Sequence, residues 1–142
     1  MTDTLNEKHE RAFSLIIILI LLAYFAAFAI VNFAGFAHFS TADMYEDTLV
    51  ARLMWEQKTL FPANYIFGNQ YYVIAAPVFA ALFYGLTGSM NTAMALATTL
   101  MSLLIALSLI WMIKPYVKSR STRLAVLLAL TAAVYMPYII EA

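Results

Sequence analysis

The chain has 142 residues, of which 64% are hydrophobic and 11% are charged, and it contains no cysteine. Soluble globular domains are about 45–50% apolar and about 25% charged, so this composition is typical of a membrane protein. The formal net charge is zero, which excludes a general attraction to nucleic acid. Without cysteine, and with only His9 and His38 as imidazole donors, disulfides, thiolate chemistry and a zinc site are not expected.

The charged residues are clustered. None lies between Ala12 and Ala37, and none lies between Thr59 and Ile113. Uncharged runs longer than about 18 residues are typical of membrane helices, because an ionised group at mid-membrane costs about 2.5–3.5 kcal/mol. The sequence therefore predicts an all-α protein made of polytopic membrane helices.

The N-terminal part of the chain predicts a tail and a first span. Residues 1–11 are polar, with no apolar period to bury, and are expected to form a frayed cytoplasmic tail. Residues 12–34 would cover about 34 Å as a helix, enough for a hydrocarbon core of about 30 Å. The run is longer than the apolar part of a signal peptide, about 7–15 residues, and is interpreted as an uncleaved anchor that ends near Asn32.

Residues 35–91 predict an outer loop that carries two further helices. From Asp43 to Gln57 the pattern favours a short amphipathic helix at the interface, with its leucines and Trp55 largely apart from its acids. A loop follows at Pro62. Residues 71–87 are apolar again, but about 17 residues is the lower limit for a span, and Pro77 in the middle of this stretch removes a backbone hydrogen bond.

The remaining sequence predicts spans at 92–113 and 124–140, joined by a basic loop at 114–123. That loop has no acid, so the positive-inside rule places it in the cytoplasm, together with the N-terminal tail, and it also touches anionic head groups. Two cytoplasmic segments require an even number of crossings between them. We therefore predict three spans in the cell membrane, with 71–87 as a re-entrant or short fourth helix on the outer side. In the alternative four-span arrangement, 71–87 crosses fully and the basic loop faces outward.

Small residues on the 92–113 span indicate helix partners. They allow close helix approach, and the sequence does not obviously supply the helices that would use them. Three spans also make a poor bundle. Residues 1–142 are therefore expected to be a single membrane module, either a fragment of a larger chain or a subunit, whose partners are the lipid bilayer and further membrane helices of the same or a partner chain. The small residues are Ala93, Ala95, Ala97, Ser102, Ala106 and Ser108.

Three acids in the outer loop are the candidate catalytic residues: Asp43, Glu46 and Asp47. On a helix, Asp43 and Asp47 share a face, so they can bind a divalent cation through oxygen ligands, or one of them can act as a general base. The structural alternative is a capping box, with Asp43 as the N-cap and Glu46 at the N3 position. The two interpretations are compatible.

Three polar residues further along are candidates for substrate binding. Arg52 and Glu56 are four apart and predict an exposed ion pair, although Arg52 can alternatively bind a phosphate. Asn69 and Gln70 lie just before the 71–87 stretch, where their amides can hydrogen-bond a sugar or simply solvate a loop.

The order of these features resembles the N-terminal part of the GT-C glycosyltransferases, the superfamily of protein mannosyltransferases and aminoarabinose transferases. The resemblance covers nearly the whole chain. Its single motifs are loose, and it rests mainly on the order in which they occur. The residues that carry it are Asp43, the run 51–54 leading to Pro62, Tyr71-Tyr72, Gly88 and the basic segment 114–123.

The resemblance implies a function at the outer membrane face. Members transfer a sugar from a polyprenyl-phosphate carrier, and an Asp or Glu in the first outer loop deprotonates the acceptor or helps to hold a metal ion. By position Asp43 matches best, eight residues before Ala51, Asp47 is second because gaps in such a loop are common, and Glu46 is third. The chain departs from many members, which have two adjacent acids where it has Asp43-Met44. Members also have later helices, so the module is expected to be inactive alone. The alternative is a non-enzymatic membrane subunit or scaffold in which Asp43 only caps a helix.

Overall fold

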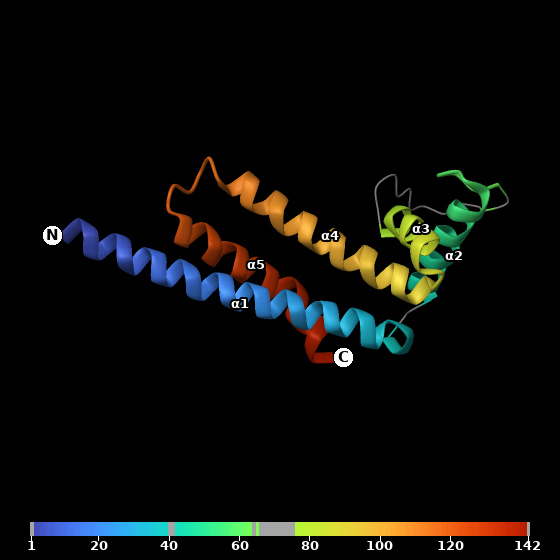
Figure 1. The fold of residues 1–142 in the computed structure, drawn as a ribbon, viewed down its shortest axis with the longest axis horizontal. Helices are drawn as coiled ribbons and strands as arrows, with labels where there is room; N and C mark the ends of the chain where they lie inside the picture. The colour runs from blue at the N-terminus through green and yellow to red at the C-terminus, as the bar shows by residue number, and fades with distance from the viewer. Residues whose placement is uncertain (1, 40–41, 64, 66–75, 142) are drawn as a thin grey trace. The chain divides into compact units, whose positions relative to one another are not determined.

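In the residues that it describes, the computed structural model of the chain has five α-helices. The backbone is described for residues 2–39, 42–63, 65 and 76–141, and the side chains for residues 7–34, 45–63, 65 and 76–133. These residues contain no β-strand, which confirms the all-α prediction. In chain order the helices are α1 (Thr2–Phe39), α2 (Ala42–Gln57), α3 (Ala76–Thr87), α4 (Met90–Ile113) and α5 (Arg120–Glu141) (Figure 1).

The helices contribute to two units, which comprise Met1–Phe28 with Leu103–Ala142, and Ala29–Ser102. In the first unit, the core joins Ile17 and Leu21 of α1 to Ala106 of α4 and Leu127 of α5. The phenol of Tyr24 also donates a hydrogen bond of 3.2 Å to a backbone carbonyl oxygen of α5. Apolar packing and polar contacts therefore both hold α1 against α5.

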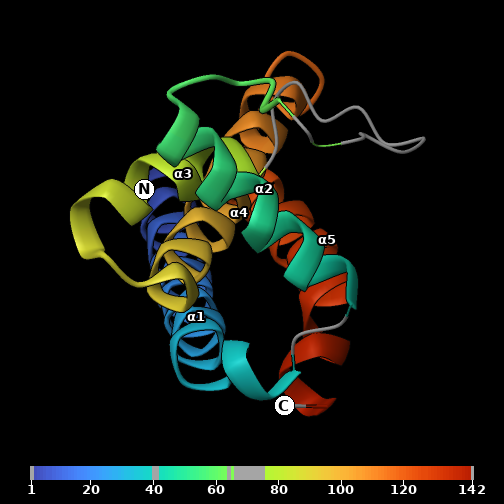
Figure 2. The same cartoon turned by 90° about the vertical axis from the view of Figure 1, so that its right-hand side faces the viewer.

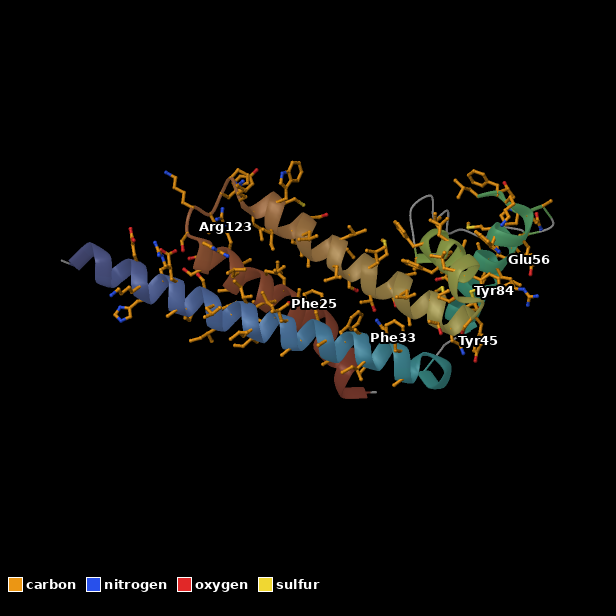
Figure 3. All side chains as sticks on the ribbon, in the orientation of Figure 1. Phe25, Phe33, Tyr45, Glu56, Tyr84 and Arg123 are labelled. Atoms are coloured by element: carbon orange, nitrogen blue, oxygen red, sulfur yellow. The ribbon has the colours of Figure 1, made fainter. Side chains whose placement is uncertain are left out.

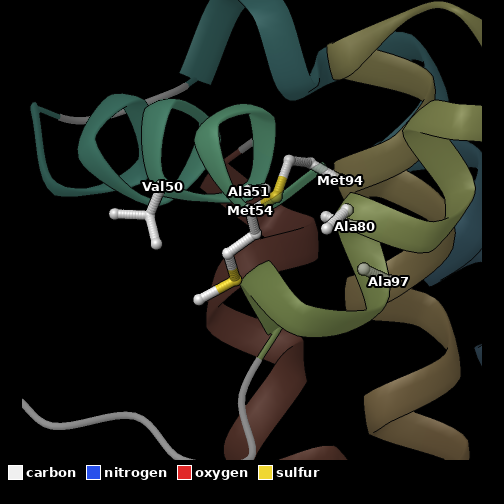
Figure 4. Close-up of a cluster of buried hydrophobic side chains, with 7 residues drawn as sticks. Val50, Ala51, Met54, Ala80, Met94 and Ala97 are labelled. Carbon is white, nitrogen blue, oxygen red and sulfur yellow. The ribbon is translucent and has the colours of Figure 1, made fainter. Parts of the chain in front are cut away.

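The second unit is built on α2 and α3, which lie side by side (Figures 1 and 2). Its core is made mostly of small side chains, and Figure 4 shows six of its seven members with labels. Small side chains let helices approach closely, so this packing depends on the alanines. In the same unit the buried amide of Asn32 on α1 donates a hydrogen bond of 3.2 Å to the Thr99 hydroxyl of α4. The core residues are Val50, Ala51, Met54, Ala80, Ala81, Met94 and Ala97.

The helix ends in this unit are capped by their local sequence. Gly88, with a φ of 67°, follows α3 and donates its N–H to the carbonyl of Tyr84 at 2.9 Å. The next residue, Ser89, is the N-cap of α4, where its hydroxyl accepts from the Thr92 N–H at 3.4 Å. These two caps allow α4 to begin directly after α3.

The N-terminal tail was predicted to be frayed, and this prediction is wrong. α1 begins at Thr2 and continues without a break into the apolar run, ending at Phe39 beyond the predicted limit of 34. The tail contains good helix formers, and Glu7 and Arg11 form an i,i+4 ion pair with N and O atoms 3.5 Å apart. A polar sequence can therefore extend a helix that the apolar run has already nucleated.

Of the predicted stretch 71–87, the structure describes a helix over Ala76–Thr87, which contains Pro77. Residues 71–75 lie outside the described residues. α5 begins at Arg120, so the helix includes the last four residues of the predicted basic loop. The hydroxyl of Ser119 caps this helix by accepting from the Thr122 N–H at 3.3 Å.

The small residues of α4 were expected to need partner helices, but the chain itself covers most of them. Ala93, Ala95, Ala97, Ser102 and Ala106 are buried, and Ser108 is exposed. The sequence identified the packing face of α4 correctly. It did not reveal that helices of the same chain fill that face.

Two helical segments are long and apolar enough to cross a membrane: Glu7–Ala34 within α1, and α4. Only 22% and 33% of their apolar windows are buried inside the protein, whereas a core helix of a soluble protein is mostly buried. The third predicted span, 124–140, falls in α5, where side chains beyond residue 133 lie outside the described ones. That span stays a prediction.

Candidate functional site

The predicted acidic cluster lies at the start of α2. The helix begins at Ala42, so Asp43 lies inside its first turn and not at the predicted N-cap position. The carboxylate of Glu46 accepts a hydrogen bond from the Tyr65 phenol. The side chain of Asp43 lies outside the described residues.

Asp47 lies on the packed side of α2. Positions 47, 50, 51 and 54 follow the i, i+3, i+4, i+7 pattern of one helix face, and Val50, Ala51 and Met54 are all buried. Asp47 itself is half-buried, whereas Leu49 is 50% exposed. Asp47 and Leu49 thus lie on different sides of the helix, as the sequence predicts, but the side that packs against the protein is the one with Asp47 and not the one with Leu49.

The segment after α2 folds back along the helix. Lys58, with a φ of 53°, ends α2, and the Thr59 N–H donates to the Met54 carbonyl at 3.2 Å, which is the pattern of a Schellman cap. The side chain of Gln57 then holds the backbone of Ala63 at two points, accepting from its N–H at 2.7 Å and donating to its carbonyl at 3.3 Å. This return brings Tyr65 beside the acids.

The environment of Tyr65 keeps its phenol protonated. Burial raises its pKa to about 12, and the hydrogen bond to Glu46 and the negative charges of Glu46 and Asp47 act in the same direction. A neutral phenol is a hydrogen-bond donor, and Tyr65 donates to the Glu46 carboxylate. The three side chains form what we call the acidic site: Glu46, Asp47 and Tyr65.

Arg52 forms the ion pair that the sequence predicted. Its Nε lies 2.7 Å from a carboxylate oxygen of Glu56, and both side chains are about half exposed. The hydrogen bond to Glu56 raises the pKa of the guanidinium, assisted by the charge of Glu56 and by Tyr84 of α3 (Figure 3). An exposed pair contributes little to stability. Phosphate binding by Arg52 stays a prediction.

Two residues that matter for the acidic site were missed at the sequence level. Tyr65 and Gln57 show no local pattern, since each contacts a residue that only the return of the chain brings close. A tyrosine within a loop rich in turn residues was the one available signal. Asn69 and Gln70, the predicted sugar-binding residues, lie outside the described residues.

The described side chains do not form a metal centre. Within the described part of the chain, no group of three His, Asp or Glu side chains is placed to hold a metal ion. Glu46 is engaged by a phenol, and a site of Asp47 alone provides too few of the six to eight oxygen ligands that Ca²⁺ takes, or of the octahedral set that Mg²⁺ takes. The predicted metal site pairs Asp47 with Asp43, whose side chain lies outside the described residues, so that site stays a prediction.

Comparison with known proteins adds no relative. No protein-family model matches the chain, and no curated protein and no solved structure is significantly similar to it.

Proposed function

We propose that the chain is a multi-pass protein of the cell membrane with its N-terminus in the cytoplasm. The support is the exposure of apolar side chains on α1 and α4, because lipid is the environment that accepts such a surface. A cleaved signal sequence would account for α1, which lies near the N-terminus, but not for α4. The third span is α5, and α3 lies on the outer side without crossing.

Within this membrane protein, we propose that the acidic site belongs to a glycosyltransferase module that uses a polyprenyl-phosphate sugar. The observation that carries the proposal is a half-buried carboxylate, Asp47, at the start of the helix that follows the first apolar helix. Asp47 is the preferred base among the acids described at this site because its side chain is half-buried, whereas that of Glu46 is exposed. Asp43 remains the positional match to the GT-C superfamily.

The proposed reaction is a substitution at the anomeric carbon of the sugar. An acceptor hydroxyl forms the new C–O bond while the bond from the sugar to the phosphate oxygen breaks, and polyprenyl phosphate leaves with the electron pair. The carboxylate takes the proton of the acceptor. The later helices that complete such an enzyme are the proposed partners of this module.

The test measures the release of polyprenyl phosphate by the wild-type protein and its variants. Each is co-expressed with the membrane subunits that co-purify with the wild-type protein. Polyprenyl-phosphate mannose and polyprenyl-phosphate aminoarabinose are the donors. Asp47→Asn is expected to lower release about 10²–10⁴-fold, the usual value of a general base, with expression and insertion unchanged. Glu56→Gln is the matched control, because it removes an exposed carboxylate of the same helix.

A second function, a non-enzymatic membrane subunit, is favoured by one observation. The Glu46 carboxylate stabilises the return of the chain through Tyr65, which is a structural role. If the site is only structural, cells with Asp43→Asn or Asp47→Asn are indistinguishable from cells with the wild-type protein. The wild-type protein then also releases no polyprenyl phosphate from either donor. That result would reject the glycosyltransferase proposal while leaving the membrane assignment intact.

A further inference from the structure

A polar cavity lies at the end of the first unit, where α1 meets the segment that leads into α5. Its volume is about 830 Å³, enough for a lipid head group and the first part of its chains. Two parts of the chain more than a hundred positions apart form its wall, and both belong to the same unit. The lining residues are Glu7, Glu10, Arg11, Ser14, Leu15, Ile18, Lys118, Ser119 and Arg120.

The acids of this cavity already have partners. Glu7 pairs with Arg11, with N and O atoms 3.5 Å apart. Glu10 accepts hydrogen bonds from the hydroxyls of Ser119 at 2.9 Å and Ser121 at 3.3 Å, and so ties the start of α5 to α1. The remaining charges on the wall are two cations.

Those two cations are Lys118 and Arg120. Neither forms an ion pair with a described residue, and both side chains are exposed. The five charged side chains of the wall sum to one positive charge, from three cations and two acids. The cavity therefore favours an anion, and the ammonium and guanidinium groups suit a phosphate.

The wall of the cavity also has an apolar side. Leu15 and Ile18 lie one turn further along α1 than the charged residues, and Leu15 is 58% exposed. A soluble anion would leave these side chains uncovered. A ligand with a phosphate next to hydrocarbon would contact both sides of the cavity.

The neighbouring turn has the character of a membrane surface. Trp111 and Tyr116, at the end of α4 and in the turn after it, are 77% and 87% exposed. Aromatic side chains with one polar group prefer the level of the lipid head groups. The segment that carries Lys118 and Arg120 follows directly.

We propose that this cavity binds one anionic phospholipid, with its phosphate on Lys118 and Arg120 and its acyl chain along Leu15 and Ile18. The inference rests on the proposed membrane location but not on glycosyl transfer. Lipid binding is measured without a sugar donor, so its failure is distinct from failure of the enzyme proposal.

The test compares two double variants with the same loss of charge. The full-length protein is reconstituted in nanodiscs of phosphatidylcholine with a minor fraction of phosphatidylglycerol, and retained phosphatidylglycerol is counted by native mass spectrometry. Lys118→Gln with Arg120→Gln removes both cations of the cavity. Lys114→Gln with Arg123→Gln is the matched control, because these residues lie in the same basic segment but do not line the cavity.

Direct charge-assisted contacts of two cations with one phosphate are expected to make the cavity variant weaken phosphatidylglycerol retention about a hundredfold, whereas loss of the same charge outside the cavity weakens it less than about threefold. Lys118→Arg with Arg120→Lys keeps both charges and is expected to retain the lipid. Equal losses in the two Gln variants would overturn the proposal, since they would indicate diffuse attraction. Binding of inorganic phosphate by the wild type as tightly as phosphatidylglycerol would also overturn it, in favour of a soluble anion, because the apolar side of the cavity would then contribute nothing.

Discussion

At the scale of single residues, the acidic site depends on a contact that only the folded chain provides. The Tyr65 phenol reaches Glu46 because the segment after α2 turns back, and the Gln57 side chain holds that return. The ion pair of Arg52 with Glu56 was predictable because its partners are one helical turn apart. Tyr65 was not predictable, since no local spacing relates positions 46 and 65.

The high pKa of Tyr65 predicts a pH dependence. Its value of about 12 exceeds the ordinary value of 10.0, so the contact is fully present below about pH 10 and is lost as the pH rises through about 12. In a spectrophotometric titration, the tyrosinate absorbance of the wild type minus that of Tyr65→Phe is expected to rise with a midpoint near pH 12. Glu46→Gln is expected to lower this midpoint only in part, because burial, the largest cause, remains. A midpoint near 10 in the wild type would contradict the contact.

At the scale of helices, the apolar runs predicted most of the fold. α2 and α4 lie within two residues of their predicted limits, because uncharged runs and turn residues mark helix ends locally. The length of α1 and the start of α5 were not predicted correctly. Polar residues at the end of an apolar run can continue the helix or form a loop, and packing decides between the two. The fit between α2 and α3 could not be predicted, because it depends on which residues face each other.

That fit is clearest at Gly85 of α3. A Cβ added there would overlap three ring carbons of Trp55 on α2, and the Lys58 ammonium lies over the same ring, 3.2 Å from its centre. Glycine therefore provides the space in which the indole lies. Trp55 therefore packs between two helices of the chain.

Gly85→Ala is expected to destabilise the protein, against the usual trend. Alanine in place of glycine inside a helix ordinarily stabilises by about 0.5–1 kcal/mol, but overpacking costs about 1–3 kcal/mol. The predicted net loss is about 1 kcal/mol, measured by thermal unfolding in detergent. In a Trp55→Leu background the ring is gone, and Gly85→Ala is expected to stabilise. Stabilisation in both backgrounds would show that the indole does not occupy this space.

At the scale of the whole molecule, the direction of the chain through the membrane remains a prediction from charge. Residues 76–87 of the predicted 71–87 stretch form α3, and residues 71–75 lie outside the described ones, so whether this stretch crosses stays a prediction. The three-span and four-span arrangements then differ in where two exposed positions lie.

Those positions are Leu86, at the end of α3, and Tyr116, in the turn after α4, which are 83% and 87% exposed. The chain has no cysteine, so a single introduced thiol is the only target for a membrane-impermeant maleimide. With three spans, Leu86→Cys is labelled on intact cells and Tyr116→Cys only after permeabilisation. With four spans the two results exchange. Leu60→Cys lies outside in both arrangements and serves as the control for access.

We expect the three-span result, because the segment around Tyr116 carries lysine and arginine but no acid, and such segments stay in the cytoplasm. Another position in the same basic segment, Ser119, is less suitable for the label, because its hydroxyl caps α5 and binds Glu10. Labelling of Tyr116→Cys on intact cells, with Leu86→Cys protected, would place the basic segment outside. The anionic lipid of the proposed cavity would then have to come from the outer leaflet, so this one measurement also decides which leaflet supplies it.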